Sequence, residues 1–128
     1  MNSSSKRLFF SYSTIFDIDI NDLHNFFRIQ LNSNNRELLY CIISIINEKT
    51  YVYCELDRKL CVQNKYFLML KSNSNIFTPK FYSTSNKIDI MKFLHDGKVL
   101  INEDNLIFYL NKRRRHKKFE KIIKNNTI

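Results

Sequence analysis

Apolar residues in the first third of the chain change from the spacing of a strand to the spacing of a helix. Residues 7–13 (RLFFSYS) are a short aromatic run bounded by Ser and Thr, which predicts a strand. Over residues 17–31 the apolar positions recur at i, i+3, i+7 and i+11, as on one face of a helix. They are Ile20, Leu23, Phe27 and Leu31. Since Asp19 or Asn21 can serve as the N-cap, we expect an amphipathic helix here.

The next two segments have the alternation of β-strands. Residues 37–46 are apolar on both alternating sets of positions, which is typical of a strand in the interior of a sheet. Residues 50–56 are expected to form a second strand, in which alternate side chains face opposite sides of the sheet. Thr50, Val52, Cys54 and Leu56 form one set, and Tyr51, Tyr53 and Glu55 form the other. Because only residues 47–49 separate the two segments, we predict an antiparallel hairpin.

The patterns in the second half of the chain are shorter. Residues 65–70 are apolar and fit either a helix or a strand, whereas residues 75–82 are expected to be extended because Pro79 disfavours a helix. Residues 86–95 predict a second short helix that ends at Gly97 as its C-terminal cap. The residues expected to face inward from this helix are Ile88, Met91 and Leu94.

Together these elements predict an α+β fold. We expect a small antiparallel sheet of about five strands, backed on one side by the two helices in a ferredoxin-like or RRM-like arrangement. Residues 106–110 could add one more strand or begin a helix. A single domain would span residues 7–111, between a flexible N-terminus at 1–6 and a basic C-terminal tail at 112–128.

The net charge of +9 is concentrated near the C-terminal end. Residues 112–124 hold eight lysines and arginines against Glu120, a net +7, so the rest of the chain carries about +2. The run KRRRHKK at 112–118 has three interpretations. It resembles a nuclear import signal, it could bind phosphate backbones nonspecifically, or it could only keep the protein soluble.

The composition excludes several classes of protein. Gly97 is the only glycine, so neither a Walker loop nor a dinucleotide-binding fingerprint can be built. Cys41, Cys54 and Cys61 form no CxxC pair and have no histidine at ligand spacing, so we interpret them as structural thiols rather than a disulfide or a metal site. No run of 18 consecutive apolar residues occurs. We therefore expect an intracellular protein with no cofactor, no metal and no membrane contact.

Four segments follow one another in an order found in a known family. They are RLFFSYS (7–13), ELLYCIISIINEKTYVYCELDRK (37–59), LCVQNKYFLML (60–70) and NIFTPKFYSTSNKIDIMKFLHDG (75–97). In this order they resemble the origin-binding, nicking domain of rolling-circle replication initiator (Rep) proteins of geminivirus- and circovirus-like single-stranded DNA viruses and related plasmids. The resemblance covers residues 7 to about 97, and it implies a Rep-like fold from a virus, a plasmid or a virus-derived gene.

The resemblance implies a metal site on the hairpin, because the second motif of the family is His-x-His and its imidazoles hold a divalent metal at the scissile phosphate. Tyr51 and Tyr53 occupy these positions here, and a neutral phenol is a poor metal ligand. Lys49 and Tyr51 are an alternative alignment, which supplies no histidine either. The acidic metal ligand of the family falls near residues 43–45, where there is no carboxylate.

The resemblance also implies a tyrosine nucleophile on the second helix, which forms a covalent link to DNA. Phe93 or Lys92 stands at this position, and Phe has no hydroxyl. Tyr82 as a relocated nucleophile is disfavoured because no metal ligands accompany it. The three histidines lie far apart and outside the metal motif, at His24, His95 and His116, and we expect His24 to be a surface or capping side chain. We therefore expect no catalytic residue and no nicking activity.

The expected function is a DNA-binding module that does not cut DNA. Tyr51 and Tyr53 are candidates for stacking on bases, which is worth roughly 1–3 kcal/mol per base. The candidate phosphate contacts are Lys59, Lys65, Lys71 and Lys80 beside the sheet loops, and Lys112, Arg113, Arg114, Arg115, Lys117 and Lys118 in the tail. The alternative is a Rep-fold interaction protein that binds a host or replication protein, with the basic tail for targeting to the nucleus of a host cell. A basic sheet face would favour DNA, and an apolar patch would favour a protein partner.

Overall fold

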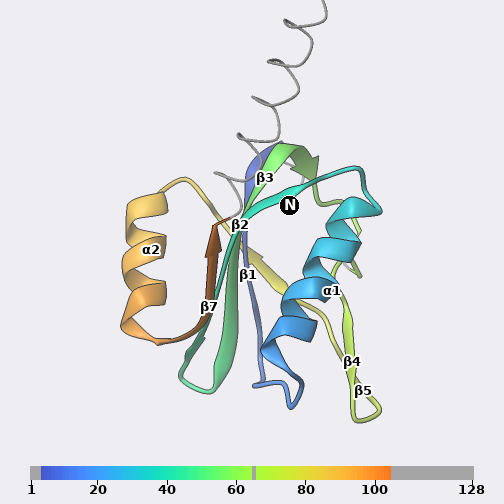
Figure 1. Ribbon diagram of the computed structural model, residues 1–128, viewed down its shortest axis with the longest axis vertical. Helices are drawn as coiled ribbons and strands as arrows, with labels where there is room; N and C mark the ends of the chain where they lie inside the picture. Colours follow the sequence, from blue (N-terminus) through green and yellow to red (C-terminus); the bar gives the residue numbers. More distant parts are fainter. Residues whose placement is uncertain (1–3, 65, 105–128) are drawn as a thin grey trace, which may run out of the picture.

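The computed structural model describes residues 4–64 and 66–104, and Figure 1 shows their arrangement. The elements are β1 (Ser4–Tyr12), α1 (Ile20–Asn32), β2 (Leu38–Ile46), β3 (Lys49–Cys61), β4 (Leu70–Ser72), β5 (Asn75–Phe77), β6 (Lys80–Tyr82), α2 (Lys87–Asp96) and β7 (Lys98–Asp104). Five strands form an antiparallel sheet in the order β6-β1-β3-β2-β7, while β4 and β5 form a separate small sheet. The predicted α+β class is confirmed, and the order β6-β1-β3-β2 fits a ferredoxin-like arrangement.

β2 and β3 form the predicted hairpin. Cys41 of β2 lies opposite Cys54 of β3 in the register. The chain turns between the strands at Asn47 and Glu48, whose φ angles of 50° and 63° lie in the left-handed region. β2 is an interior strand with β3 on one side and β7 on the other, as its two apolar sets of residues predict.

The two helices cover opposite faces of the sheet, so the prediction that both pack on one side is wrong (Figure 1). The sheet face under α1, here called the α1 face, buries Leu8, Phe10, Tyr12, Cys41, Ile43, Val52 and Cys54. The α2 face buries Phe9, Ile42 and Tyr53 against Ile90 and Leu94 of the helix. Consecutive residues of a strand point to opposite faces, and both sets are apolar in the central strands. Each face therefore needs its own cover.

α1 begins where the sequence predicts. The Asp19 side chain is the N-cap and accepts a hydrogen bond of 2.8 Å from the backbone N–H of Asn21. Three of the four predicted apolar residues are buried, namely Leu23, Phe27 and Leu31, and Ile20 packs at the edge of the same core. His24 is also buried, with 5% of its surface exposed, so the expected surface or capping role is wrong.

α2 begins one residue later than predicted, with Asn86 as the N-cap. Its side chain accepts a hydrogen bond of 3.1 Å from the N–H of Asp89. The inward stripe is Ile90 and Leu94, whereas Ile88 is 70% exposed, which corrects the prediction that Ile88 faces inward. Residues two positions apart in a helix differ by about 200° around its axis. Because Ile90 is buried, Ile88 therefore faces outward.

Gly97 caps α2 as predicted, but it does so in an extended conformation, with φ −90°. Glycine is required at position 97 because the backbone packs closely against β2. A Cβ atom at this position would lie 2.6 Å from Ser44 Oγ and 2.8 Å from the Ile45 carbonyl oxygen, and closer still to Ile46 Cγ1. Only glycine lets the chain pass from α2 into β7 with its backbone so close to β2.

Other boundaries differ from the prediction. β1 begins at Ser4, so residues 4–6 belong to the sheet rather than to a flexible N-terminus. The apolar segment near residues 66–70 contains a turn followed by the start of β4, and residues 75–82 are extended as predicted. β7 was not predicted. The proposed element at 106–110, the domain boundary at 111 and the basic tail lie outside the described residues.

Candidate nucleic-acid interface

Four aromatic rings gather on the α2 face of the sheet, where Phe9 shares a buried cluster with Ile90 and Leu94 of α2. Phe9 of β1, Tyr51 of β3, Tyr82 of β6 and Phe93 of α2 are called the aromatic cluster here. The centroids of Tyr51 and Phe93 are 5.0 Å apart with the rings at 82°, while those of Phe9 and Tyr82 are 5.1 Å apart. Tyr51 and Tyr82 lie nearly parallel at 6.3 Å. Three strands and a helix therefore contribute to one continuous aromatic surface.

The four rings differ in their exposure. Phe93 is 38% exposed and Tyr51 and Tyr82 are half-buried, whereas Phe9 is 9% exposed and forms the floor of the cluster. Tyr82 is fixed by a hydrogen bond of 2.7 Å between its hydroxyl and the hydroxyl of Ser11. Lys80 places its ammonium 5.6 Å from the centre of the Tyr82 ring. The cluster thus presents flat, partly exposed rings with a cation at its edge.

Tyr53 lies on the same face as Tyr51 but is fully buried. Its hydroxyl donates a hydrogen bond of 2.9 Å to Glu55 Oε2. Burial raises the pKa of Tyr53, and the Glu55 carboxylate raises it further, so the phenol stays neutral. A ring without exposed surface cannot stack on a base, so Tyr53 does not belong to the candidate interface.

Tyr51 is also a neutral phenol. Partial burial raises its pKa, and the neighbouring Tyr82 adds to the effect. Neither tyrosine of the Tyr-x-Tyr pair therefore supplies the anionic oxygen that would bind a divalent ion well.

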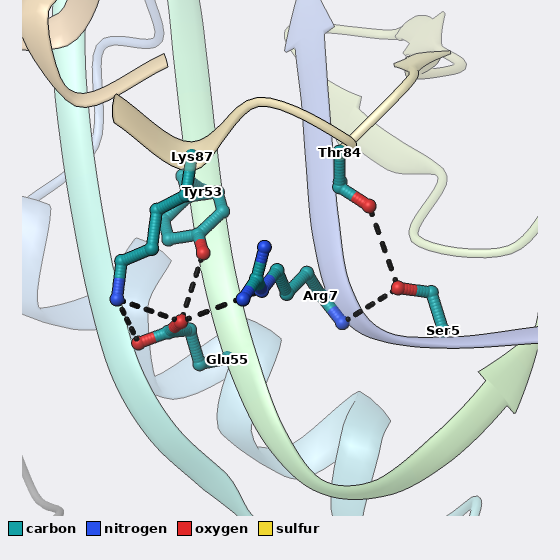
Figure 2. A network of polar contacts seen from close by, with 6 residues as sticks. All are labelled: Ser5, Arg7, Tyr53, Glu55, Thr84 and Lys87. Atoms are coloured by element: carbon teal, nitrogen blue, oxygen red, sulfur yellow. Dashed lines mark hydrogen bonds and ion pairs between the residues drawn. The ribbon is translucent and has the colours of Figure 1, made fainter. Parts of the chain in front are cut away.

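Figure 2 shows a network of polar contacts centred on Glu55. The carboxylate of Glu55 lies 3.0 Å from the Lys87 ammonium and 3.9 Å from Nε of Arg7. It also accepts the Tyr53 hydrogen bond, so its charge is already compensated by two cations. Ser5 Oγ accepts the backbone N–H of Arg7 at 3.0 Å and lies 3.4 Å from the Thr84 hydroxyl. The network joins β3, β1 and the first turn of α2.

A pocket of about 250 Å³ opens beside this network. Its apolar part is formed by Leu8, Phe9, Leu60, Val62 and Phe81, and its polar part by Ser5, Arg7, Tyr82 and the 83–85 hydroxyl loop. The polar part offers hydroxyl groups and one guanidinium, which are donors suited to a phosphate oxygen. Because Phe9 and Tyr82 line both features, the pocket and the aromatic cluster adjoin each other.

The structure brings together some of the predicted site residues. Tyr51, which the resemblance aligns with the metal pair, is in contact with Phe93, one of the two residues it aligns with the nucleophile. Lys92 is exposed on α2, and Lys59 is exposed near the end of β3. The segment at 43–45, where the acidic ligand of the family falls, is divided, since Ile43 packs on the α1 face. Lys65 and the predicted basic contacts of the tail lie outside the described residues; these are Lys112, Arg113, Arg114, Arg115, Lys117 and Lys118.

The sequence patterns did not predict Phe9 and Tyr82 as binding residues. In the strand RLFFSYS, alternation places Phe9 and Ser11 on one face. They lie opposite Tyr53 and Tyr51 of β3, so the alternation is the signal that could have predicted Phe9 as part of the site. Tyr82 reaches the cluster only because β6 pairs with β1, where Phe9 lies opposite Tyr82. No local pattern predicts that pairing.

No protein-family model matches the chain, and a comparison with curated proteins finds no significant relative. Neither described helix has the length and the hydrophobicity needed to cross a membrane. Within residues 4–64 and 66–104, no group of three or more His, Cys, Asp or Glu side chains is arranged to hold a metal ion.

Proposed function

We propose that this protein is a Rep-like DNA-binding module of viral or plasmid origin that binds DNA without nicking it. The observation that carries the proposal is the contact of Tyr51 with Phe93, 5.0 Å between ring centroids. The resemblance aligns Tyr51 with the metal pair and Phe93, or alternatively Lys92, with the nucleophile, and these two motifs lie on separate elements and must meet in an active enzyme. Their meeting supports a retained scaffold with altered side chains.

The side chains that meet can bind but cannot cleave. Nucleophilic attack on a phosphate requires an activated hydroxyl, which Phe93 lacks, and a metal to polarise the phosphate. Flat aromatic rings instead stack on bases, with a stabilisation of roughly 1–3 kcal/mol per base. Lys80 at the edge of the cluster supplies a cation for the neighbouring phosphates.

Single-stranded DNA fits this surface better than a duplex. Tyr51 and Tyr82 on the sheet and Phe93 on α2 offer partly exposed rings to unpaired bases, whereas the bases of a duplex are already stacked on one another. The pocket that adjoins the cluster, with Arg7 and the 83–85 loop, offers donors that suit the phosphates of a bound strand, which supports the proposal. The basic run at 112–118 would add affinity that does not depend on sequence, and it would direct the protein to a host nucleus.

The test is the affinity of the full chain for a fluorescent single-stranded oligonucleotide and for the same sequence as a duplex, measured by anisotropy at several salt concentrations. Stacking on the cluster predicts tighter binding of the single strand, and the preference should persist at high salt because stacking releases few counterions. Equal affinities that disappear together with salt would show that only the charged tail binds, and would remove the aromatic cluster from the proposal.

A Rep-fold interaction protein is the second candidate, and one observation favours it. Ile88 is 70% exposed on the outer face of α2, close in sequence to the partly exposed Met91. Met91 also packs against the buried cluster of the α2 face, so the candidate contact is Ile88 with the exposed part of Met91 beside it. Under this alternative, Ile88→Lys would abolish partner binding and leave the affinity for DNA unchanged.

A further inference from the structure

Two buried cysteines lie opposite each other at the centre of the sheet, away from the candidate interface. Cys41 of β2 and Cys54 of β3 are direct partners in the antiparallel register, and both are 0% exposed on the α1 face. Their sulfur atoms are 3.9 Å apart, and the Cys54 thiol donates its hydrogen to the Cys41 sulfur. We propose that Cys41 and Cys54 are a redox pair that forms a reversible cross-strand disulfide, with His24 as the base that activates Cys41.

The backbone already has the spacing that a disulfide needs. Residues directly opposite in antiparallel strands have Cα atoms about 4.5–5.5 Å apart, and disulfides accept roughly 4.4–6.8 Å. Forming the bond requires the sulfur atoms to approach from 3.9 Å to about 2.05 Å, which side-chain rotation can supply. The strands themselves can keep their register.

A row of groups leads from Cys41 toward solvent. Glu103 of the edge strand β7 lies opposite Cys41 in the register, and its side chain is 43% exposed. Its carboxylate oxygen lies 3.2 Å from Nδ1 of His24, whose side chain is 6% exposed. Nε2 of His24 is buried and has no hydrogen-bond partner among the described residues. Glu103 thus orients the imidazole and leaves its second nitrogen available to accept a proton.

The electrostatics distinguish the two sulfurs. The hydrogen bond from Cys54 lowers the pKa of Cys41, and His24 lowers it further, against the opposing effect of burial. The pKa of Cys54 is raised by the same hydrogen bond and by burial. In the proposed step Cys41, whose sulfur accepts the hydrogen bond from Cys54, is the attacking sulfur, and Cys54 is the thiol that resolves the product.

The oxidant of the proposed step is hydrogen peroxide. The Cys41 proton moves to His24, and the thiolate sulfur attacks one peroxide oxygen. The O–O bond breaks, and the departing hydroxide takes the proton from His24 to leave as water. The sulfur of Cys54 then attacks the sulfenic acid on Cys41, the S–O bond breaks, and a second water leaves with the Cys54 proton. Two thiols lose two electrons and two protons, and one peroxide becomes two waters.

The position of the three cysteines makes the test direct. Trypsin cleaves after Arg36, Lys49, Arg58, Lys59 and Lys65, so Cys41, Cys54 and Cys61 fall on three different peptides, 37–49, 50–58 and 60–65. The reduced full chain is treated with peroxide, its remaining thiols are blocked, and the digest is analysed by mass spectrometry without reduction. We expect peptides 37–49 and 50–58 joined, with the loss of two hydrogen atoms, and released by dithiothreitol. Cys61→Ser should give the same linked pair.

The role of His24 is tested by the rate of disulfide formation and by its dependence on pH. His24→Gln keeps an amide that can bond to Glu103 but cannot take up the proton, so the bond should form roughly tenfold more slowly or worse, with a steeper rise in rate as pH increases. Asn25→Ala, on the exposed side of the same helix, should react at the wild-type rate. Melting curves show whether each variant is folded.

Two results would overturn the proposal. If peroxide oxidises Cys61 fully while peptides 37–49 and 50–58 stay unlinked, or if the linked product always contains Cys61, the pair is only structural. If a folded His24→Gln variant forms the bond at the wild-type rate and with the wild-type pH profile, His24 is not the base. Each of these results concerns thiols alone and leaves the proposed DNA binding untouched.

Discussion

Tyr51 of β3 and Phe93 of α2 meet edge to face, with ring centroids 5.0 Å apart and an angle of 82° between the rings. The contact joins a strand in the interior of the sheet to the helix that packs on its α2 face. An edge-to-face aromatic pair contributes about 0.5–1.5 kcal/mol beyond its burial. The same pair therefore holds α2 in place and forms part of the surface proposed to bind DNA.

The first prediction concerns the absent chemistry. Incubated with Mn²⁺ or Mg²⁺ and single-stranded DNA, the full chain should give neither a nicked product nor a covalent adduct. Phe93→Tyr restores a hydroxyl but not the histidine pair, so this variant should also be inactive. Denaturing gels measure both. A protein–DNA band that a single tyrosine-to-phenylalanine change abolishes would show that the protein is an active nuclease.

The second prediction concerns Gly97. In Gly97→Ala the new Cβ meets Ser44 Oγ at 2.6 Å and the Ile45 carbonyl at 2.8 Å, so β2 and the end of α2 must separate. We expect a loss of about 1–3 kcal/mol in the free energy of unfolding, as for other overpacked sites. The measurement is urea denaturation, with the exposed neighbour Asp96→Ala as the control. A Gly97→Ala variant as stable as the control would mean that the close approach to β2 is not real.

The third prediction concerns alkaline pH. Tyr12 and Tyr53 are both 0% exposed, and burial, as the largest cause, raises the pKa of each. Because the folded-state values lie above the unfolded value of about 10, the neutral phenols stabilise the fold fully below pH 10. This contribution is lost as the pH rises from about 10 toward the folded-state values. The urea midpoint should therefore fall steeply above about pH 10.

Tyr12→Phe separates this effect from others. The variant loses the hydrogen bond of 2.6 Å from the Tyr12 hydroxyl to the Leu68 carbonyl oxygen, so it should be less stable at neutral pH by about 0.5–1.5 kcal/mol. Its stability should fall less steeply above pH 10 than that of the wild type, whereas Tyr66→Phe, at a site 54% exposed, should keep the wild-type slope. Identical slopes for Tyr12→Phe and the wild type would contradict the assignment.

The fourth prediction concerns residues 112–128. With a net +7 of the total +9 in residues 112–124, this segment should supply most of the salt-dependent affinity for nucleic acid. Deleting 112–128 should flatten the plot of log affinity against log salt, by about 0.7 for each phosphate of a single strand that the tail no longer neutralises. The fold should survive, as a melting curve would show. An unchanged salt slope would mean that the tail does not bind nucleic acid, and an unfolded product would mean that it is part of the domain.

The periodicity of the sequence was a good guide to α1 and to the β2–β3 hairpin, because both have a clear alternation of apolar and polar positions. It failed for the side on which α2 packs. Ile88, Ile90, Met91 and Leu94 allow two apolar stripes, and only the packing against Ile42 and Tyr53 selects Ile90 and Leu94. β7 was missed because a short edge strand tolerates polar residues on both sets of positions.

The candidate site was predictable in part. The resemblance named Tyr51 and Phe93, which the fold brings together, but it also named Tyr53, which the fold buries. Tyr51 and Tyr53 lie on the same face of β3, but only Tyr53 is fully buried in the cluster with Ile90 and Leu94. This difference depends on tertiary packing, which the alternation of residues along β3 does not predict. Phe9 and Tyr82 joined the cluster through the pairing of β1 with β6, which connects distant parts of the chain.

The most direct test of the central claim is the effect of Phe93→Ala on the affinity of the full chain for single-stranded DNA, measured by anisotropy at a salt concentration high enough to suppress binding by the tail. Phe93 is 38% exposed, and Tyr66→Ala, which removes an aromatic ring 54% exposed outside the cluster, is the matched control. The loss of one stacked base predicts binding about 5- to 150-fold weaker for Phe93→Ala, with Tyr66→Ala unchanged. Equal affinities of the wild type and a folded Phe93→Ala variant would contradict the claim that the aromatic cluster binds DNA.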